Sequence, residues 1–370
     1  MSNRLCILVA SLLFTRLAGG AEPDDLTALL EPIRQRHQLP ALAAAAMQEG
    51  AVKSMGVCGV RKFGSSESVT VKDRWHIGSC TKSMTASLAA MLVEEKKLSW
   101  TTTIAEVFPE LRQKMDPQWQ PVTLEQLLTH RSGAPGNPPP ALWEEAWKRK
   151  GTPTAQRLAF VRGLIAQKPA TAPGTQFTYS NQGYSIAGAM IERVTGQAWE
   201  KLIAARLFVP LKMTAAGFGP PATEGKVDHP WGHLGTPHNP VPPGPAADNP
   251  PAIGPGGTVH CSIGDFVRYA GWHARGLRNE QKLLGDAGFA RLHQPASEQG
   301  YAMGWTVTER SWAGGRALVH NGSNTMFYAV MWVAPEKDAA FVAATNAAGP
   351  EAEKACDEAV SLLVQRHLAQ

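Results

Sequence analysis

Residues 83–98 form a helical stretch whose apolar side chains fall on more than one face. Such a helix has no broad polar face to offer to water, so the rest of the chain has to cover it on several sides. Trp75-His76-Ile77-Gly78 comes shortly before it and is typical of a strand end followed by a close approach at glycine. The sequence therefore predicts a buried central helix with Ser79 at its N-terminus.

The start of this helix carries the motif Ser79-Cys80-Thr81-Lys82. A serine hydroxyl is a poor nucleophile unless a base takes its proton. Lys82 lies three residues on, one helical turn away on the same face, where its amine can reach Ser79. Free backbone N–H groups and the helix dipole also favour negative charge at this position. The alternative interpretation is a helix-capping serine beside a solvated lysine.

A second motif, Tyr179-Ser180-Asn181, follows about one hundred residues later, and each motif occurs once in the 370 residues. The phenol of Tyr179 can relay a proton, and the amide of Asn181 can orient either a substrate or the lysine. Pro173-Gly174 and Gly183 on either side suit a loop that presents a side chain into a cleft. The alternative is a buried tyrosine that only packs two helices. A capping role for Ser79 does not explain this second motif.

These residues resemble the serine β-lactamase and penicillin-binding protein superfamily, in the branch that is related to class C β-lactamases and includes esterases and D-amino-acid peptidases. The resemblance covers about residues 25–368 and extends to four flanking segments: 122–133, 173–184, 208–214 and 301–305. It implies an α/β (α+β) fold of the β-lactamase/transpeptidase type. In that fold an antiparallel sheet is flanked by helices, and the active site lies in the cleft between the sheet and an inserted, mostly helical region.

The order of predicted elements agrees with one domain over residues 22–370. Strands at both ends of the chain and helices in the middle imply one mixed sheet, built from about 25–75 and 250–370, with a helical region at about 76–245. Residues 219–257 are rich in proline and glycine and predict an irregular connection or a mobile flap. Hydrophobic patterning predicts helices at 25–37 and 351–368, and strands at 41–48, 52–60, 258–261, 303–310, 317–320, 325–334 and 339–345.

The family's third motif is a strand ending in Lys-Thr-Gly or a variant such as His-x-Gly. His-x-Gly occurs three times here, but only His320-Asn321-Gly322 has the right order and context. The resemblance assigns Asn181, His320, Gly322 and Ser323 to substrate binding, with the N–H groups of Ser79 and Ser323 forming an oxyanion hole. A histidine without a catalytic role at the strand end is the alternative for His320.

The replacement of lysine by His320 affects the expected substrate. A lysine keeps a positive charge that suits a substrate carboxylate, whereas histidine is largely neutral at pH 7. Asn321 also replaces the usual hydroxyl residue. Both changes favour esters or uncharged amides over β-lactams.

Residues 1–21 have the features of a secretory signal. Arg4 precedes an apolar run from Leu5 to Phe14, and Gly19-Gly20-Ala21 stands before Glu22, although Arg16 shortens the apolar core. The run is too short to span a bilayer, so we expect no stable membrane insertion after cleavage. Removing these residues, which carry two arginines and no acid, lowers the net charge from +5 to +3. No basic run supports a nucleic-acid partner.

No cofactor or metal is predicted. His229, His233 and His238 are spaced suggestively, but Pro230 and Gly232 break any helix that would align them. The cysteines beyond the signal are irregularly spaced, which leaves open both free thiols and a Cys58–Cys356 disulfide. The Gly-x-Ser-x-Gly elbow of α/β-hydrolases does not occur.

The predicted function is a periplasmic or secreted serine hydrolase. Ser79, Lys82 and Tyr179 would be catalytic, through an acyl-serine intermediate on a small ester, amide, peptide or lactam, with esterase activity favoured. One alternative is a D-Ala carboxypeptidase or β-lactamase with the same machinery. Another is a non-hydrolytic sensor of cell-wall ligands or a scaffold. The retention of all three side chains favours an enzyme.

Overall fold

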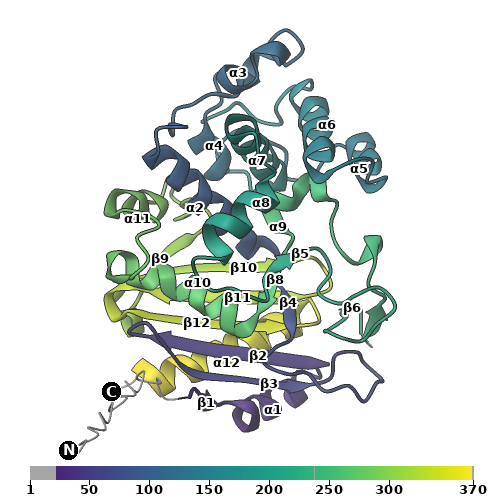
Figure 1. The fold of residues 1–370 in the computed structure, drawn as a ribbon, viewed down its shortest axis with the longest axis vertical. Helices are drawn as coiled ribbons and strands as arrows, with labels where there is room; N and C mark the ends of the chain where they lie inside the picture. The colour runs from purple at the N-terminus through teal and green to yellow at the C-terminus, as the bar shows by residue number, and fades with distance from the viewer. Residues whose placement is uncertain (1–21, 237, 369–370) are drawn as a thin grey trace, which may run out of the picture.

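The computed structural model describes residues 22–236 and 238–368, so the predicted signal segment 1–21 lies outside the described residues. Seven strands form one sheet in the order β1-β3-β2-β12-β11-β10-β9 (Figure 1). Neighbouring strands are antiparallel except for the short parallel pair β1–β3, as expected for a mostly antiparallel sheet. In the described part of the chain, none of the helices combines the length and apolar character needed to cross a membrane.

The elements agree closely with the sequence pattern. The strands are β1 (Asp24–Asp25), β2 (Ala41–Gln48), β3 (Ala51–Gly59), β4 (Arg74–His76), β5 (Gly217–Phe218), β6 (Gly232–Leu234), β7 (Asn239–Val241), β8 (Val259–Ser262), β9 (Thr306–Arg310), β10 (Gly315–Ser323), β11 (Tyr328–Ala334) and β12 (Ala339–Thr345). The helices are α1 (Thr27–Arg36), α2 (Thr81–Glu94), α3 (Ile104–Val107), α4 (Leu124–Leu128), α5 (Pro140–Trp147), α6 (Pro153–Ile165), α7 (Asn181–Thr195), α8 (Trp199–Ile203), α9 (Gly254–Gly257), α10 (Ile263–Arg275), α11 (Asp286–Leu292) and α12 (Pro350–Leu368).

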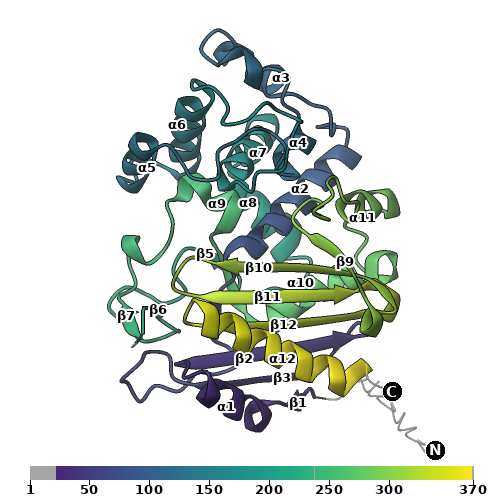
Figure 2. The ribbon, with the colours of Figure 1, turned by 180° about the vertical axis from the view of Figure 1, so that it is seen from behind.

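Helices cover both faces of the large sheet. Helices α1 and α12 lie on one face, as Figure 2 shows, and α10 packs on the other. The alternating residues of β2 therefore enter two different cores, with Ala41, Ala43 and Ala45 in one and Leu42, Ala44 and Ala46 in the other. Strands buried on both faces are apolar throughout, which explains the unbroken apolar run of β2.

The helical region lies above the sheet in Figures 1 and 2, with α2 at its base. Residues Thr81 to Leu92 of α2 are all buried, among α7, α8, α9 and α11, which confirms the prediction of a buried central helix. The helix α4 begins with a capping box, in which the Thr123 hydroxyl accepts from the Gln126 N–H and the Gln126 side chain accepts from the Thr123 N–H.

The prediction of a single sheet was wrong for the strand at 258–261. This strand, β8, forms a separate three-stranded sheet with β4 and β5. An apolar run predicts a strand but does not indicate which strand it pairs with. In the structure β8 pairs with β4, which ends shortly before Ser79. The segment 219–257 is also more regular than predicted, since it contains the β6–β7 hairpin and the helix α9.

Two strands start later than predicted. Strand β11 begins at Tyr328 because the Asn324 side chain accepts hydrogen bonds from the Met326 and Phe327 N–H groups and closes a turn. Strand β9 begins at Thr306 because Gly304, with φ of +77°, bends the chain against the backbone of α2. The four cysteines of the described chain are buried free thiols, at Cys58, Cys80, Cys261 and Cys356.

Candidate active site

Ser79 lies in a single 3-10 turn, Gly78–Cys80, between β4 and α2. Gly78 has φ of +49°, a conformation that favours glycine, and it allows this sharp change of direction. Two hydrogen bonds fix the turn: the Ile77 N–H donates to Val259 O over 3.0 Å, and the Thr81 hydroxyl donates to Gly78 O over 2.7 Å. Ser79 itself is partly exposed, at the start of the central helix as the sequence predicts.

Lys82 is buried, and its amine has three oxygen neighbours. The Nζ atom lies 3.1 Å from Ser79 Oγ, 2.5 Å from Asn181 Oδ1 and 2.6 Å from Gly256 O. The first motif thus meets the second through Asn181, which orients the lysine. Gly256 was not identified from the sequence. A Cβ there would approach Asn181 Oδ1 to 3.1 Å, so a larger residue would crowd the lysine's partner.

Burial lowers the pKa of Lys82 from its ordinary 10.5 to about 7. Loss of the proton changes what the amine can do. A neutral amine has two N–H donors and one lone pair. If the donors serve Asn181 Oδ1 and Gly256 O, the lone pair is left for the hydroxyl proton of Ser79. The geometry thus supplies an acceptor for the Ser79 proton near neutral pH.

Tyr179 lies in the loop before α7, with its ring centroid 4.7 Å from Lys82 Nζ. The next residue, Ser180, anchors it: the Ser180 N–H donates to His130 Nδ1 over 3.1 Å and the hydroxyl donates to Pro135 O over 2.6 Å. Although 38% of Tyr179 is exposed, desolvation raises its pKa above the ordinary 10, and the neighbouring Ser79 hydroxyl lowers it by less. The phenol therefore keeps its proton at neutral pH.

The ring of His130 packs against that of Tyr179. His130 was not assigned to the site in the sequence analysis. Its ring centroid lies 4.4 Å from that of Tyr179 and 4.8 Å from that of Tyr301. Burial holds the pKa of His130 well below 6.5, with the charge of Lys82 as a smaller cause. The sequence did contain one clue to His130, because it lies in segment 122–133, which resembles the family. The sequence gives no indication, however, of the backbone φ of +59° at His130.

The end of β10 packs directly against the Ser79 turn. A Cβ at Gly322 would lie 2.5 Å from the backbone nitrogen of Ser79, and a Cβ at Gly78 would lie 2.4 Å from that of Ser323. Only glycine permits such an approach. Residues 320–323, which the sequence analysis assigned to the third motif, therefore have their backbone beside Ser79. The other two His-x-Gly matches begin at His76 on β4 and at His233 on β6.

His320 is buried and both ring nitrogens have partners. Nε2 is 3.1 Å from the Tyr301 hydroxyl, and Nδ1 is 2.6 Å from Asn321 O. Burial, with a smaller effect from Lys82, lowers the pKa of His320 to about 3. The imidazole is therefore uncharged at physiological pH, as predicted for a neutral third motif.

A cavity of about 530 Å³ opens next to these residues. None of its lining residues is lysine or arginine. Burial and the neighbouring Glu353 raise the pKa of Asp357, one of the two carboxyl groups in the lining. The cavity is lined by Phe177, Tyr179, Gln299, Tyr301, Thr306, Val319, His320, Asn321, Tyr328, Val330, Trp332, Glu353 and Asp357.

The three histidines considered for a metal have other partners. His229 Nδ1 lies 3.3 Å from Asp73, and His238 Nε2 lies 3.0 Å from Gln38 O. His233 accepts from the Phe63 N–H and contacts Asn346 O. In residues 22–236 and 238–368, no three potential metal ligands cluster together.

The fold and the site define a protein of the β-lactamase and penicillin-binding type. A sequence model of the family described as Beta-lactamase matches residues 26–365, and the chain therefore belongs to that family. The family contains hydrolases of the β-lactamase/transpeptidase type.

Two relatives that are distant in sequence match 85% and 44% of this chain. Penicillin-binding protein 4 of Amycolatopsis lactamdurans is 26% identical over 329 residues, which are 85% of this chain and 83% of that protein. The lovastatin esterase of Penicillium rubens is 29% identical over 177 residues, 44% of this chain and 43% of that protein. The structure of an octameric penicillin-binding protein homologue from Pyrococcus abyssi has a TM-score of 0.73 at 24% identity, covering 92% of this chain and 78% of that one.

Proposed function

We propose that this protein is a serine hydrolase that forms an acyl-enzyme on Ser79 and prefers esters or uncharged amides. The observation that carries the proposal is the buried amine of Lys82, 3.1 Å from Ser79 Oγ, with a pKa of about 7. A nucleophile and a base within hydrogen-bond reach, with the base oriented by a third group, is the arrangement that covalent catalysis needs. Asn181 is that third group.

Acylation follows from this geometry. Ser79 Oγ forms a bond to the substrate carbonyl carbon as its proton passes to Lys82 Nζ. The N–H groups of Ser79 and Ser323 stabilise the oxyanion. The Tyr179 phenol then gives its proton to the leaving oxygen or nitrogen as the bond to the acyl carbon breaks. Lys82 returns its proton to Tyr179, which leaves both groups as they began.

Deacylation repeats the sequence with water as the nucleophile. Water bonds to the acyl carbon and gives one proton to Lys82 Nζ, since the Tyr179 phenol already carries its proton. The bond between the acyl carbon and Ser79 Oγ then breaks, and Ser79 Oγ takes the proton back from Lys82. The net reaction adds one water across the ester or amide bond, and no other reactant is required.

The preference for uncharged substrates rests on the cavity beside Tyr179. His320 contributes a neutral wall, and Glu353 and Asp357 place carboxyl groups in the lining. None of the lining residues carries a fixed positive charge that could bind a substrate carboxylate. The relative named lovastatin esterase supports this preference, whereas penicillin-binding protein 4 and the β-lactamase of Escherichia coli K12, which is 24% identical over 230 residues, support the alternative.

A matched substrate series tests the preference. We expect kcat/KM for a neutral aryl ester to exceed that for the same ester with a carboxylate on its leaving group by about 5- to 10-fold, because a like charge nearby costs about 1 kcal/mol in a solvated site. The double variant Glu353→Gln, Asp357→Asn should bring the two kcat/KM values closer together. It should leave kcat/KM for the neutral ester unchanged. A cephalosporin or a D-alanine peptide hydrolysed faster than the neutral ester would reverse the assignment in favour of a β-lactamase or D-Ala carboxypeptidase.

The same experiment separates an enzyme from a non-hydrolytic sensor or scaffold. Intact-mass spectrometry of the protein with each substrate should reveal an acyl adduct. A binding protein would give neither adduct nor turnover with any member of the series.

We also propose that residues 1–21 direct export and are removed after Ala21, which places the mature protein in the periplasm or the medium. N-terminal sequencing of the exported protein should start at Glu22. A cytoplasmic form that begins at Met1 would contradict both parts of this proposal.

A further inference from the structure

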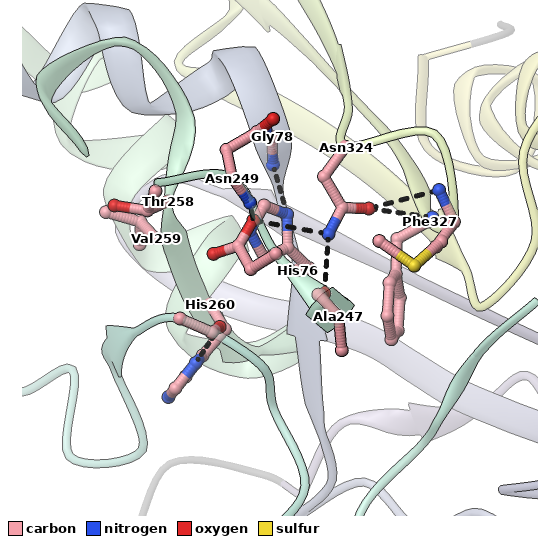
Figure 3. Close-up of polar contacts among 12 residues, drawn as sticks. His76, Gly78, Ala247, Asn249, Thr258, Val259, His260, Asn324 and Phe327 are labelled. Carbon is pink, nitrogen blue, oxygen red and sulfur yellow. Dashed lines mark hydrogen bonds and ion pairs between the residues drawn. The ribbon is translucent and has the colours of Figure 1, made fainter. Parts of the chain in front are cut away.

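A buried polar cluster joins the turn before Ser79 to the end of β10 (Figure 3). Its members are His76 at the end of β4, Asp248 in the proline-rich connection, and Asn324 just after β10. They are 0%, 1% and 3% exposed. Burying a charged or polar group lowers the stability of the fold unless other polar groups surround it. None of these three side chains forms a hydrogen bond with Lys82 or Ser79.

His76 holds the peptide next to Ser79. The Gly78 N–H donates to His76 Nδ1 over 3.1 Å, so in the neutral ring the proton has to be on Nε2. Nε2 lies 2.9 Å from Asp248 Oδ1. Nε2 has no hydrogen-bond partner, so the carboxylate acts on the ring through its nearby negative charge. Asp248 therefore favours the tautomer that accepts from Gly78.

Asp248 also contacts the segment that follows β10. Its Oδ1 accepts from the Asn249 N–H over 2.7 Å and lies 3.4 Å from Asn324 Nδ2. The Asn324 side chain also accepts from the N–H groups of Met326 and Phe327, as Figure 3 shows for Phe327. Because Asn324 follows Ser323 directly, one carboxylate is linked to both backbone segments that would form the oxyanion hole.

We infer that Asp248 and His76 are positioning residues, which hold the Ser79 and Ser323 N–H groups at the separation that an oxyanion needs. The inference rests on the proposed function. An oxyanion hole works only if its donors lie about 2.7–3.1 Å from the developing charge. The two segments are in contact at Gly78 and Gly322, so a shift of either peptide changes both donors. Interactions of this kind stabilise the transition state, so their loss lowers kcat rather than raises KM.

Two substitutions at His76 test the inference. His76→Asn can keep an acceptor near the position of Nδ1 for the Gly78 N–H, whereas His76→Gln places its amide near the position of Nε2 and leaves that N–H without its acceptor. We expect His76→Gln to lower kcat about 10- to 100-fold, less than the 10²–10³-fold loss of removing a donor outright. His76→Asn should stay within about 5-fold of the wild type. Asp248→Ala should resemble His76→Gln.

Two readouts distinguish positioning from a merely structural role. Titration with a fluorophosphonate gives kcat for each folded site, which removes the effect of unfolded protein. The affinity for a boronic acid, whose oxygen occupies the oxyanion hole, should fall by the same factor as kcat/KM. His233→Gln is the control, because His233 is equally buried and bonds Phe63 and Asn346 instead. It should lower the melting temperature and leave kcat per site unchanged.

Equal kcat per titrated site in the wild type, His76→Gln and Asp248→Ala would overturn the inference alone. So would equal losses in His76→Gln and His76→Asn. A wild-type protein that takes up no fluorophosphonate would instead overturn the proposed function, and this inference with it.

Discussion

Replacing Ser79 with alanine should abolish covalent labelling by a fluorophosphonate and lower turnover of a good ester by about 10⁶-fold. Loss of the nucleophilic serine costs about this much in a serine protease. The fold should tolerate the change, since Ser79 is partly exposed and Lys82 keeps its contacts with Asn181 and Gly256. Surface-like substitutions of this kind usually alter stability by less than about 0.5 kcal/mol. Intact-mass spectrometry and steady-state kinetics provide the measurements.

Ser87→Ala is the matched control for this prediction. Ser87 lies two turns further along α2, is fully buried, and donates to Ser83 O over 2.8 Å. Its removal should lower the melting temperature while labelling and turnover persist. Labelling that survives in Ser79→Ala but disappears in Ser87→Ala, or that moves to another residue, would contradict the choice of nucleophile.

Local geometry explains which parts of the site could be predicted from the sequence. The spacing of Ser79 and Lys82 is a property of any helix, and the multi-faced apolar pattern after them requires burial. Burial, in turn, is the main cause of the low pKa of Lys82. The link from Asn181 to the lysine was one of two options that the motif left open, and only the fold decides between them.

Features that depend on partners distant in sequence could not be predicted. His76, Asp248 and Asn324 are separated by up to 248 positions, and none belongs to a motif that indicates the others. Asp248 lies in a segment without periodicity, where sequence pattern predicts little. The pairing of β8 with β4 had the same difficulty, because strand patterns specify faces but not neighbours.

The pH dependence of the reaction should identify Lys82 as the base. A protonated Lys82 cannot accept the Ser79 proton, so kcat/KM should rise with pH, about tenfold per unit below 7, and level off above it. Five other titratable groups at the site have pKa values displaced from neutrality. Those of His130 and His320 are lowered and those of Tyr179, Tyr184 and Tyr301 are raised, each mainly by burial.

Two variants test which residue causes the rise of kcat/KM with pH, called here the rising limb. Lys82→Met should lower kcat/KM by about 10²–10⁴-fold and abolish the limb, because methionine fills the space but cannot take a proton. Tyr179→Phe should lower the rate over a similar range but keep the limb near pH 7, since it removes only the phenol that protonates the leaving group. Lys82→Met leaves Asn181 Oδ1 and Gly256 O without a donor, which costs about 1–3 kcal/mol each, so activity has to be compared per titrated site. If the limb persists in Lys82→Met and disappears in Tyr179→Phe, the tyrosine is the base and the lysine only lowers its pKa.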